Sequence, residues 1–185
     1  MATKSICKTV HIRDKRLASQ LINALESAKG KRSTEIHFSK KVYDLKGDQI
    51  KDMFGAKWMD GYVQISLLDL IEQVGEKRAK SILSDFSCPL NAELEKYLKT
   101  TSIEFAKQKI APTYLIFTSY QQQMVLIAYY TTNIKALSID RFAVSRSMRK
   151  RINKFATYDN VLKSYLIAAP LVAQLGKNYT NGYNK

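Results

Sequence analysis

The chain has 185 residues, 45% of them hydrophobic and 25% charged, which is the balance of a globular protein with one domain, or one domain and a small module. Its formal net charge of +14 indicates either a polyanionic partner, such as nucleic acid or a phosphate-rich ligand, or a lysine-rich surface that only keeps the protein soluble. The apolar stretches are too short to span a bilayer and no apolar signal segment opens the chain, so we expect a cytoplasmic protein without membrane contact.

Cysteine and histidine content argues against a metal centre. Cys7 and Cys88 are far apart and form no Cys-x-x-Cys, so we expect neither a disulfide framework nor a zinc site. His11 and His37 lie in strand-like segments and are interpreted as surface or half-buried strand residues. Neither a bound metal nor a histidine-based catalytic triad is therefore expected.

Residues 1–55 predict a small β-α-β-α module. Apolar residues alternate in its two strands and recur at helical spacing in its longer helix. Asp14 precedes that helix as a candidate N-cap, and Gly30 follows it as a stop signal. The predicted elements are a strand over Lys8–Arg13, a helix that ends at Ala28, a strand over Thr34–Phe38 and a short helix over Asp48–Phe54.

Residues 56–185 predict a second, larger domain of mixed α and β structure, with the junction between the two modules at about residues 55–60. Two apolar strands joined by a short turn are typical of an antiparallel hairpin. A third strand is interrupted by Pro170, which indicates a sheet edge or a bulge. The predicted elements are a short strand at Val63 and Ile65, helical structure over Leu67–Leu83 broken near Gly75, a helix capped by Asn91 and ended by Pro112, strands over Thr113–Thr118 and Met124–Thr132, a basic and mostly helical insert over Asp140–Tyr165, and a strand over Leu166–Leu175.

Three strings after residue 85 occur in an order that resembles the first half of the GNAT N-acetyltransferase fold. Phe86-Ser-Cys88, followed by Asn91, Leu94, Tyr97 and Leu98, is similar to the opening of toxin-like and phage-borne members. Val125–Thr132 resembles their second hairpin strand, with Ala128 in place of the usual glycine, and Pro170–Asn178 resembles the strand before the pyrophosphate loop. The resemblance covers Phe86–Lys185 and implies α+β (mixed α/β) architecture with a partial GNAT acyltransferase sheet.

This resemblance implies that acetyl-CoA is the cofactor. Backbone groups of the third strand are expected to bind its pantetheine arm, and the following loop its pyrophosphate, since glycine and free amides favour anions. The double-glycine pattern of that loop is not completed, so the chain is expected to be the N-terminal portion of such an enzyme and inactive alone. The expected cofactor-binding residues are Leu175, Gly176, Lys177, Asn178, Asn181, Gly182 and Lys185.

The resemblance also implies direct attack of an amine on the acetyl thioester. The amide of Leu175 or of Gly176 is the expected donor to the thioester oxygen, while no catalytic acid or base can be assigned. Glu93, Glu95 and Glu104 lie on a helix that family members use near the substrate, or else form a solvated helix face.

The densest positive run, Arg146–Lys154, predicts an amphipathic helix with Met148, Ile152 and Phe155 facing inward. Its outward cations are expected either to contact an RNA backbone, such as that of tRNA, or to be ordinary surface charges. The candidate nucleic-acid-binding residues are Arg146, Arg149, Lys150 and Lys154.

Two functions therefore compete. The first is an acetyl-CoA-dependent N-acetyltransferase acting on an amine of a protein or of an aminoacyl-tRNA. The second is a non-catalytic basic protein that binds nucleic acid or another partner. An incomplete sheet would leave the edge of the Pro170–Leu175 strand exposed, which predicts pairing into a homodimer or poor solubility.

Overall fold

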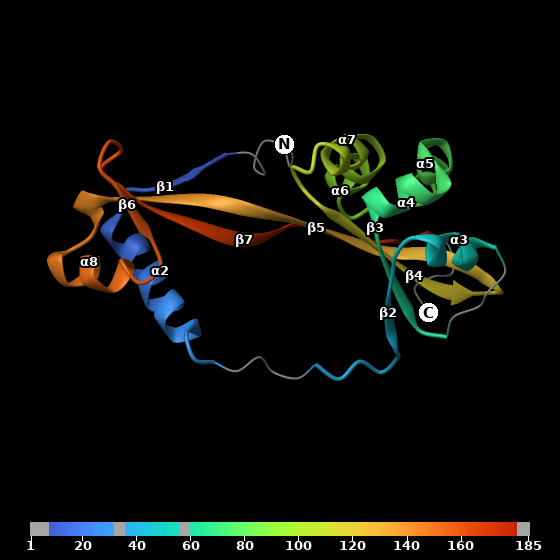
Figure 1. The fold of residues 1–185 in the computed structure, drawn as a ribbon, viewed down its shortest axis with the longest axis horizontal. Helices are drawn as coiled ribbons and strands as arrows, with labels where there is room; N and C mark the ends of the chain where they lie inside the picture. The colour runs from blue at the N-terminus through green and yellow to red at the C-terminus, as the bar shows by residue number, and fades with distance from the viewer. Residues whose placement is uncertain (1–7, 32–35, 56–59, 181–185) are drawn as a thin grey trace. The chain divides into compact units, whose positions relative to one another are not determined.

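The computed structural model describes residues 8–31, 36–55 and 60–180 (Figure 1). These residues form two compact units. Unit 1 contains residues 37–133 and 172–180, whereas unit 2 combines residues 8–36 with residues 134–171. This division does not coincide with the predicted junction at residues 55–60. It arises because the N-terminal strand pairs with the end of a strand more than 100 residues later, while the segment after residue 37 pairs within unit 1.

Unit 1 contains both helices and strands. Its first strand pairs in parallel with the second, and the second, third and fourth strands pair in antiparallel fashion. The elements are β2 (Val42–Leu45), α3 (Asp48–Phe54), β3 (Tyr62–Ser66), α4 (Leu67–Val74), α5 (Glu76–Ser84), α6 (Ala92–Lys96), a π-helical turn η1 (Tyr97–Thr101), α7 (Ser102–Lys107), β4 (Thr113–Tyr120), and parts of β5 (Gln123–Asp140) and β7 (Ser164–Lys177).

A predicted helix cap and a predicted helix break are both present in the structure. Asn91 caps α6 by accepting hydrogen bonds from the amides of Glu93 and Leu94. Gly75 has a φ of +83°, a conformation that favours glycine, and separates α4 from α5. The predicted break in the helical stretch and the predicted cap are therefore confirmed.

All helices of unit 1 cover one face of its sheet. The buried strand residues on this face alternate along each strand, as in Leu115 and Phe117 of β4. Figure 1 shows α4, α5, α6 and α7 on one side of these strands, and Phe54 of α3 makes an edge-on contact with Phe117 at 5.7 Å between ring centroids. Leu115 and Phe117 belong to the same hydrophobic cluster as the buried residues of α3, α4, α5 and α7.

Unit 2 has its own, smaller core. It contains β1 (Val10–Ile12), α2 (Lys15–Ala28), the last part of β5, η2 (Arg141–Ala143), α8 (Arg146–Ile152), β6 (Thr157–Asp159) and the first part of β7. β1 pairs in parallel with Leu137–Ile139 of β5, and β6 pairs with the start of β7 in antiparallel fashion. The strand order is β2-β3-β4-β5-β7-β6, with β1 beside β5, and it contains both parallel and antiparallel pairs. The expected α+β (mixed α/β) class is therefore confirmed.

Two predicted elements are wrong. Residues 36–38 form no strand, and Thr34 lies outside the described residues; the strand forms instead at Val42–Leu45. Ile36 and Phe38 are 73% and 63% exposed, so their alternation has no sheet to pack against. The insert predicted as mostly helical contains one helix, the seven-residue α8, beside a 3-10 turn, β6 and the start of β7, because Thr157–Asp159 and Ser164–Leu166 pair with each other as strands.

Candidate functional site

The predicted cofactor strand corresponds to the C-terminal part of β7. Leu175 is 69% exposed, Lys177 is exposed, and Asn178 is 1% exposed. Gly176 is buried, and a Cβ atom at this position would come within 2.4 Å of Cε1 of Tyr129. The structure therefore places Gly176 on the helix-covered side of the sheet, and by strand alternation it places Leu175 on the uncovered face. The predicted loop residues Asn181, Gly182 and Lys185 lie outside the described residues.

Asn178 anchors this end of β7 to two other segments. Its Nδ2 donates to the carbonyl of Leu126 at 2.7 Å, and its Oδ1 accepts from the amides of Ser87 and Thr180 at 2.9 and 3.0 Å. Its own amide donates to the carbonyl of Ile127 at 2.7 Å. The side chain is thus fully engaged within the protein, which makes Asn178 a positioning residue for the strand before it.

The amide of Leu175 points toward a free edge of the sheet. Successive residues of a strand direct their backbone groups to opposite sides, and the amide of Asn178 points toward β5. Gly176 therefore faces β5 as well, whereas Leu175 and Lys177 direct their amides away from it. Among the described strands of unit 1, none pairs with this second edge of β7.

A polar pocket of about 490 Å³ opens on unit 1 at the end of β3. We call it the sheet-face pocket, since most of its lining comes from the face that the helices leave uncovered. Sequence reasoning missed it, because its residues come from five elements that only the strand pairing brings together. It is lined by Asp44, Lys46, Gln64, Ser66, Asp69, Tyr114, Tyr130 and Thr132.

A chain of polar contacts orders one side of the sheet-face pocket. The hydroxyl of Tyr130 donates to Oε1 of Gln64 at 2.9 Å, and Nε2 of Gln64 donates to Oδ1 of Asp44 at 3.4 Å. The other oxygen of Asp44 lies 3.6 Å from Nζ of Lys46. Burial raises the pKa of Tyr130, and the nearby Tyr114 and Asp44 raise it further to a smaller extent. The hydroxyl of Tyr130 therefore remains protonated and acts as a donor.

The three glutamates predicted near a substrate do not gather at a common site. Glu95 accepts hydrogen bonds from the amide of Cys88 at 2.9 Å and from Lys99 at 2.8 Å. The hydrogen bond from Lys99, and to a smaller extent that from the amide of Cys88, holds the pKa of Glu95 below its ordinary value. Glu93 and Glu104 are exposed, and Glu104 lies 3.8 Å from Lys107. Glu95 therefore stabilises the loop before α6, and none of the three lines the sheet-face pocket.

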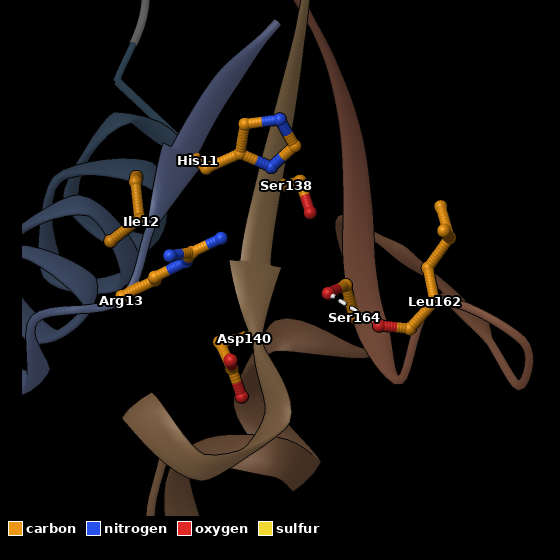
Figure 2. A pocket seen from close by; sticks show the side chains of 7 residues that line it. All are labelled: His11, Ile12, Arg13, Ser138, Asp140, Leu162 and Ser164. Carbon is orange, nitrogen blue, oxygen red and sulfur yellow. Dashed lines mark hydrogen bonds between the residues drawn. The ribbon is translucent and has the colours of Figure 1, made fainter.

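A smaller cavity of about 220 Å³ lies in unit 2 (Figure 2). His11 lies in β1, Arg13 directly follows this strand, and Ser138 and Asp140 belong to the neighbouring β5. Ser164 closes one side, where its hydroxyl donates to the carbonyl of Leu162 at 3.1 Å. His11 is thus a strand residue, as predicted, and it lines a cavity of mixed charge.

The predicted basic helix forms, but it is shorter than expected. Arg146 and Lys150 are exposed on α8, and Lys154 is exposed beyond the end of the helix. Arg149 is half-buried, and its guanidinium donates to the carbonyls of Val144 and Arg141 at 3.4 and 3.3 Å. Of the four predicted cations, three are therefore free to meet a polyanion, whereas Arg149 stabilises the turn before the helix.

Arg151 links α8 to α2 and should contribute a pH-dependent part of the stability of unit 2. Its Nε donates to Glu26 at 2.9 Å and its Nη2 to Asn23 at 2.6 Å. The hydrogen bond from Arg151 holds the pKa of Glu26 below its ordinary value of 4.5, so this contribution is present above pH 4.5 and is lost as pH falls through the lowered pKa.

Arg151→Ala is therefore expected to lower the free energy of unfolding modestly at neutral pH, as the loss of a largely exposed ion pair does. The difference from the parent should shrink in urea denaturation at acidic pH, once the carboxyl group of Glu26 is protonated. Exposed Lys150→Ala is the matched control. An equal loss at both pH values would contradict the role of the carboxylate.

Comparison with known proteins gives limited information. No known protein family and no curated protein matches the sequence. Among solved structures, the chain is similar to AtaT complexed with acetyl-methionyl-tRNAfMet, with 20% sequence identity and a TM-score of 0.36. The match covers 54% of this chain and 52% of the other, so it spans about half the length of that protein. A TM-score this low does not establish a shared fold, and function has to be inferred from the residues themselves.

Clusters of metal ligands and membrane-spanning helices are both absent from the described part of the chain. No group of three or more His, Cys, Asp or Glu side chains gathers there as a metal site would require. Cys88 is a buried free thiol, and Cys7 lies outside the described residues. Within the same residues, none of the helices has the length and apolar character needed to cross a bilayer.

Proposed function

We propose that this chain provides the thioester-binding strand of an acetyl-CoA-dependent N-acetyltransferase. The observation that carries the proposal is the free edge of β7 at Leu175 and Lys177, one strand away from the sheet-face pocket. A free strand edge offers backbone donors and acceptors to an extended, amide-containing arm such as pantetheine. Lys177 adds a positive charge that favours the phosphates of the same cofactor.

Two features of the strand support this assignment. Gly176 packs against Tyr129, and Asn178 holds the end of the strand by hydrogen bonds, so the edge is fixed before a ligand arrives. A preorganised donor costs no rearrangement when charge develops on the thioester oxygen. We therefore assign this donor to the amide of Leu175, and the predicted alternative, Gly176, to the ladder with β5.

When bound, acetyl-CoA supplies a thioester whose acetyl group passes to an amine nitrogen, with the departing sulfur taking up the proton that the amine loses. The contribution of Leu175 is to donate a hydrogen bond to the thioester oxygen. Lys177 attracts the phosphates, and Asn178 keeps both residues in place. We assign no acid or base among the described residues, since none of the glutamates expected near a substrate lines the pocket.

The test is titration of the ¹⁵N-labelled chain with acetyl-CoA, followed by the amide resonances of β7. We expect the amides of Leu175 and Lys177 to shift and the amide of Gly176 to shift less. Leu175→Pro removes one donor at an edge where proline is tolerated and should weaken binding about tenfold. Leu175→Ala keeps the donor and should bind within about twofold of the parent. Absence of any shift would refute the cofactor assignment.

A second function, binding of nucleic acid, is favoured by the distribution of charge. Residues 7–36 and 134–171, which make up unit 2, contain 15 of the 30 Lys and Arg residues but only five of the 16 acidic residues, and thus carry +10 of the net charge of +14. Exposed Arg146, Lys150 and Lys154 form the densest part of this surface. We propose that unit 2 contacts an RNA backbone through these residues.

Replacing these three cations with alanine should reduce the salt dependence of binding to single-stranded RNA. About 0.7 counterions are released for each neutralised phosphate, so the slope of log K against log salt should fall by about 2. The matched control replaces Lys77, Lys96 and Lys109, three exposed lysines of unit 1. An equal change in both triple variants would show that only total charge matters and would refute a surface on unit 2.

A further inference from the structure

We propose that the sheet-face pocket of unit 1 binds an organic ammonium ion whose body packs on the stacked rings of Tyr114 and Tyr130. Binding itself is independent of the acetyltransferase function. The ligand class follows from the charge, the aromatic surface and the size of the pocket.

The charge of the pocket opposes that of the whole chain. Asp44 and Asp69 line it together with one cation, Lys46, in a protein with a net charge of +14. Lys46 is paired with Asp44 at 3.6 Å, so Asp69 supplies the excess negative charge. The pocket therefore carries a negative charge, although the protein as a whole is positive. This local negative charge favours a cation over an anion as the ligand.

Asp69 provides the pocket with a carboxylate that is available to a ligand. It lies in the first turn of α4. It is half-buried, and neither a hydrogen bond nor an ion pair joins it to another residue in the described part of the chain. A partly desolvated carboxylate gains most from a ligand that brings both a positive charge and N–H donors.

The aromatic pair provides a second, independent preference for the same ligand. The rings of Tyr114 and Tyr130 are stacked, with centroids 5.0 Å apart and planes inclined by 18°. Tyr130 is fixed by its hydrogen bond to Gln64, so the ring faces are preorganised. Tyrosine faces attract cations and pack against flat or apolar bodies. A cavity of about 490 Å³ is within the size range of small-molecule sites.

The probe is phenylalaninamide, which joins one ammonium group to an aromatic ring and carries no carboxylate. Its neutral match is N-acetylphenylalaninamide, which keeps the ring but lacks the charge. The full ¹⁵N-labelled chain is titrated with each compound to about 10 mM, at about pH 6, where the amine is charged. We expect phenylalaninamide to shift the amides of Ser66, Asp69 and Thr132, and the neutral compound to bind at least tenfold more weakly.

Two pocket variants and one control separate binding from damage to the fold. Asp69→Asn keeps the shape of the side chain and should weaken binding about tenfold, and Tyr114→Leu should weaken it severalfold. Asp48→Asn removes an exposed carboxylate outside the pocket and should leave binding unchanged. Equal binding of both compounds, or unchanged binding by Asp69→Asn, would overturn the proposal.

Acetyl-CoA binding, measured separately on the same variants, distinguishes this inference from the proposed function. Binding of the amine by a chain that does not bind acetyl-CoA would retain the pocket and refute the cofactor assignment. Binding of acetyl-CoA by a chain that binds phenylalaninamide no more tightly than the neutral compound would retain the cofactor assignment and overturn the pocket. If both hold, Asp69→Asn should weaken binding of the amine, while binding of acetyl-CoA stays within about twofold of the parent.

Discussion

Replacing Asn178 with alanine is expected to lower the free energy of unfolding by about 3 kcal/mol. The side chain is 1% exposed and joins the carbonyl of Leu126 to the amides of Ser87 and Thr180. Alanine would leave these backbone groups without partners, and a buried group without a partner costs more than the bond it lost. Urea denaturation followed by circular dichroism measures the change.

The neighbouring Lys177 provides the control for Asn178. Its side chain is exposed, so Lys177→Ala should change stability by less than about 0.5 kcal/mol. Amide exchange at Leu126 and Ser87 should accelerate in Asn178→Ala and remain unchanged in Lys177→Ala. Similar losses in the two variants would mean that the hydrogen bonds of Asn178 do not anchor the strand.

Gly176→Ala is expected to destabilise the protein by about 2 kcal/mol through overpacking. The new methyl group would lie 2.4 Å from Cε1 of Tyr129 and 3.1 Å from Cζ of Phe86. Both rings are fully buried and contact each other edge-on at 5.3 Å between centroids, so neither can move without displacing the other. Thermal or urea denaturation reports the loss of stability.

A double-mutant cycle tests the cause of this effect. Tyr129→Leu removes the ring that the methyl group would meet, so Gly176→Ala should cost less in that background than in the parent. Leu175→Ala, at a residue that is 69% exposed, controls for a general effect of substitutions in β7. If the changes in the free energy of unfolding caused by Gly176→Ala and by Tyr129→Leu were additive, a steric conflict between the new methyl group and the Tyr129 ring would be excluded.

Local sequence signals were sufficient for most helices and for the central hairpin. Asp14 caps α2 through a hydrogen bond to the amide of Leu17, Asn91 caps α6, and Asp48–Phe54 forms α3 with the predicted bounds. These signals act within a few residues, so they can be recognised without knowledge of the fold. The strands of the hairpin were also located, because their apolar runs are bounded by turn residues.

The parts that could not be predicted depend on partners distant in sequence. The parallel pairing of β1 with β5 joins Val10 to Leu137, and no local pattern in either segment indicates the other. The sheet-face pocket needs Asp44, Asp69 and Tyr130 to be brought together by the same kind of pairing. Asn178 was predicted from the sequence as a cofactor-binding residue, and its role as an anchor became visible only with Leu126 and Ser87 beside it.

Unit 2 is formed from two segments that are distant in sequence, and this also affects how the chain folds during its synthesis. Glu26 of α2 pairs with Arg151, which is 125 residues later in the chain. At about 5–20 residues per second, a ribosome takes about 6–25 s to cover this distance. Throughout this interval the apolar face of α2 around Ala18 and Ile22 lacks its later partners, so α2 is packed long after it is made and is prone to aggregation until then.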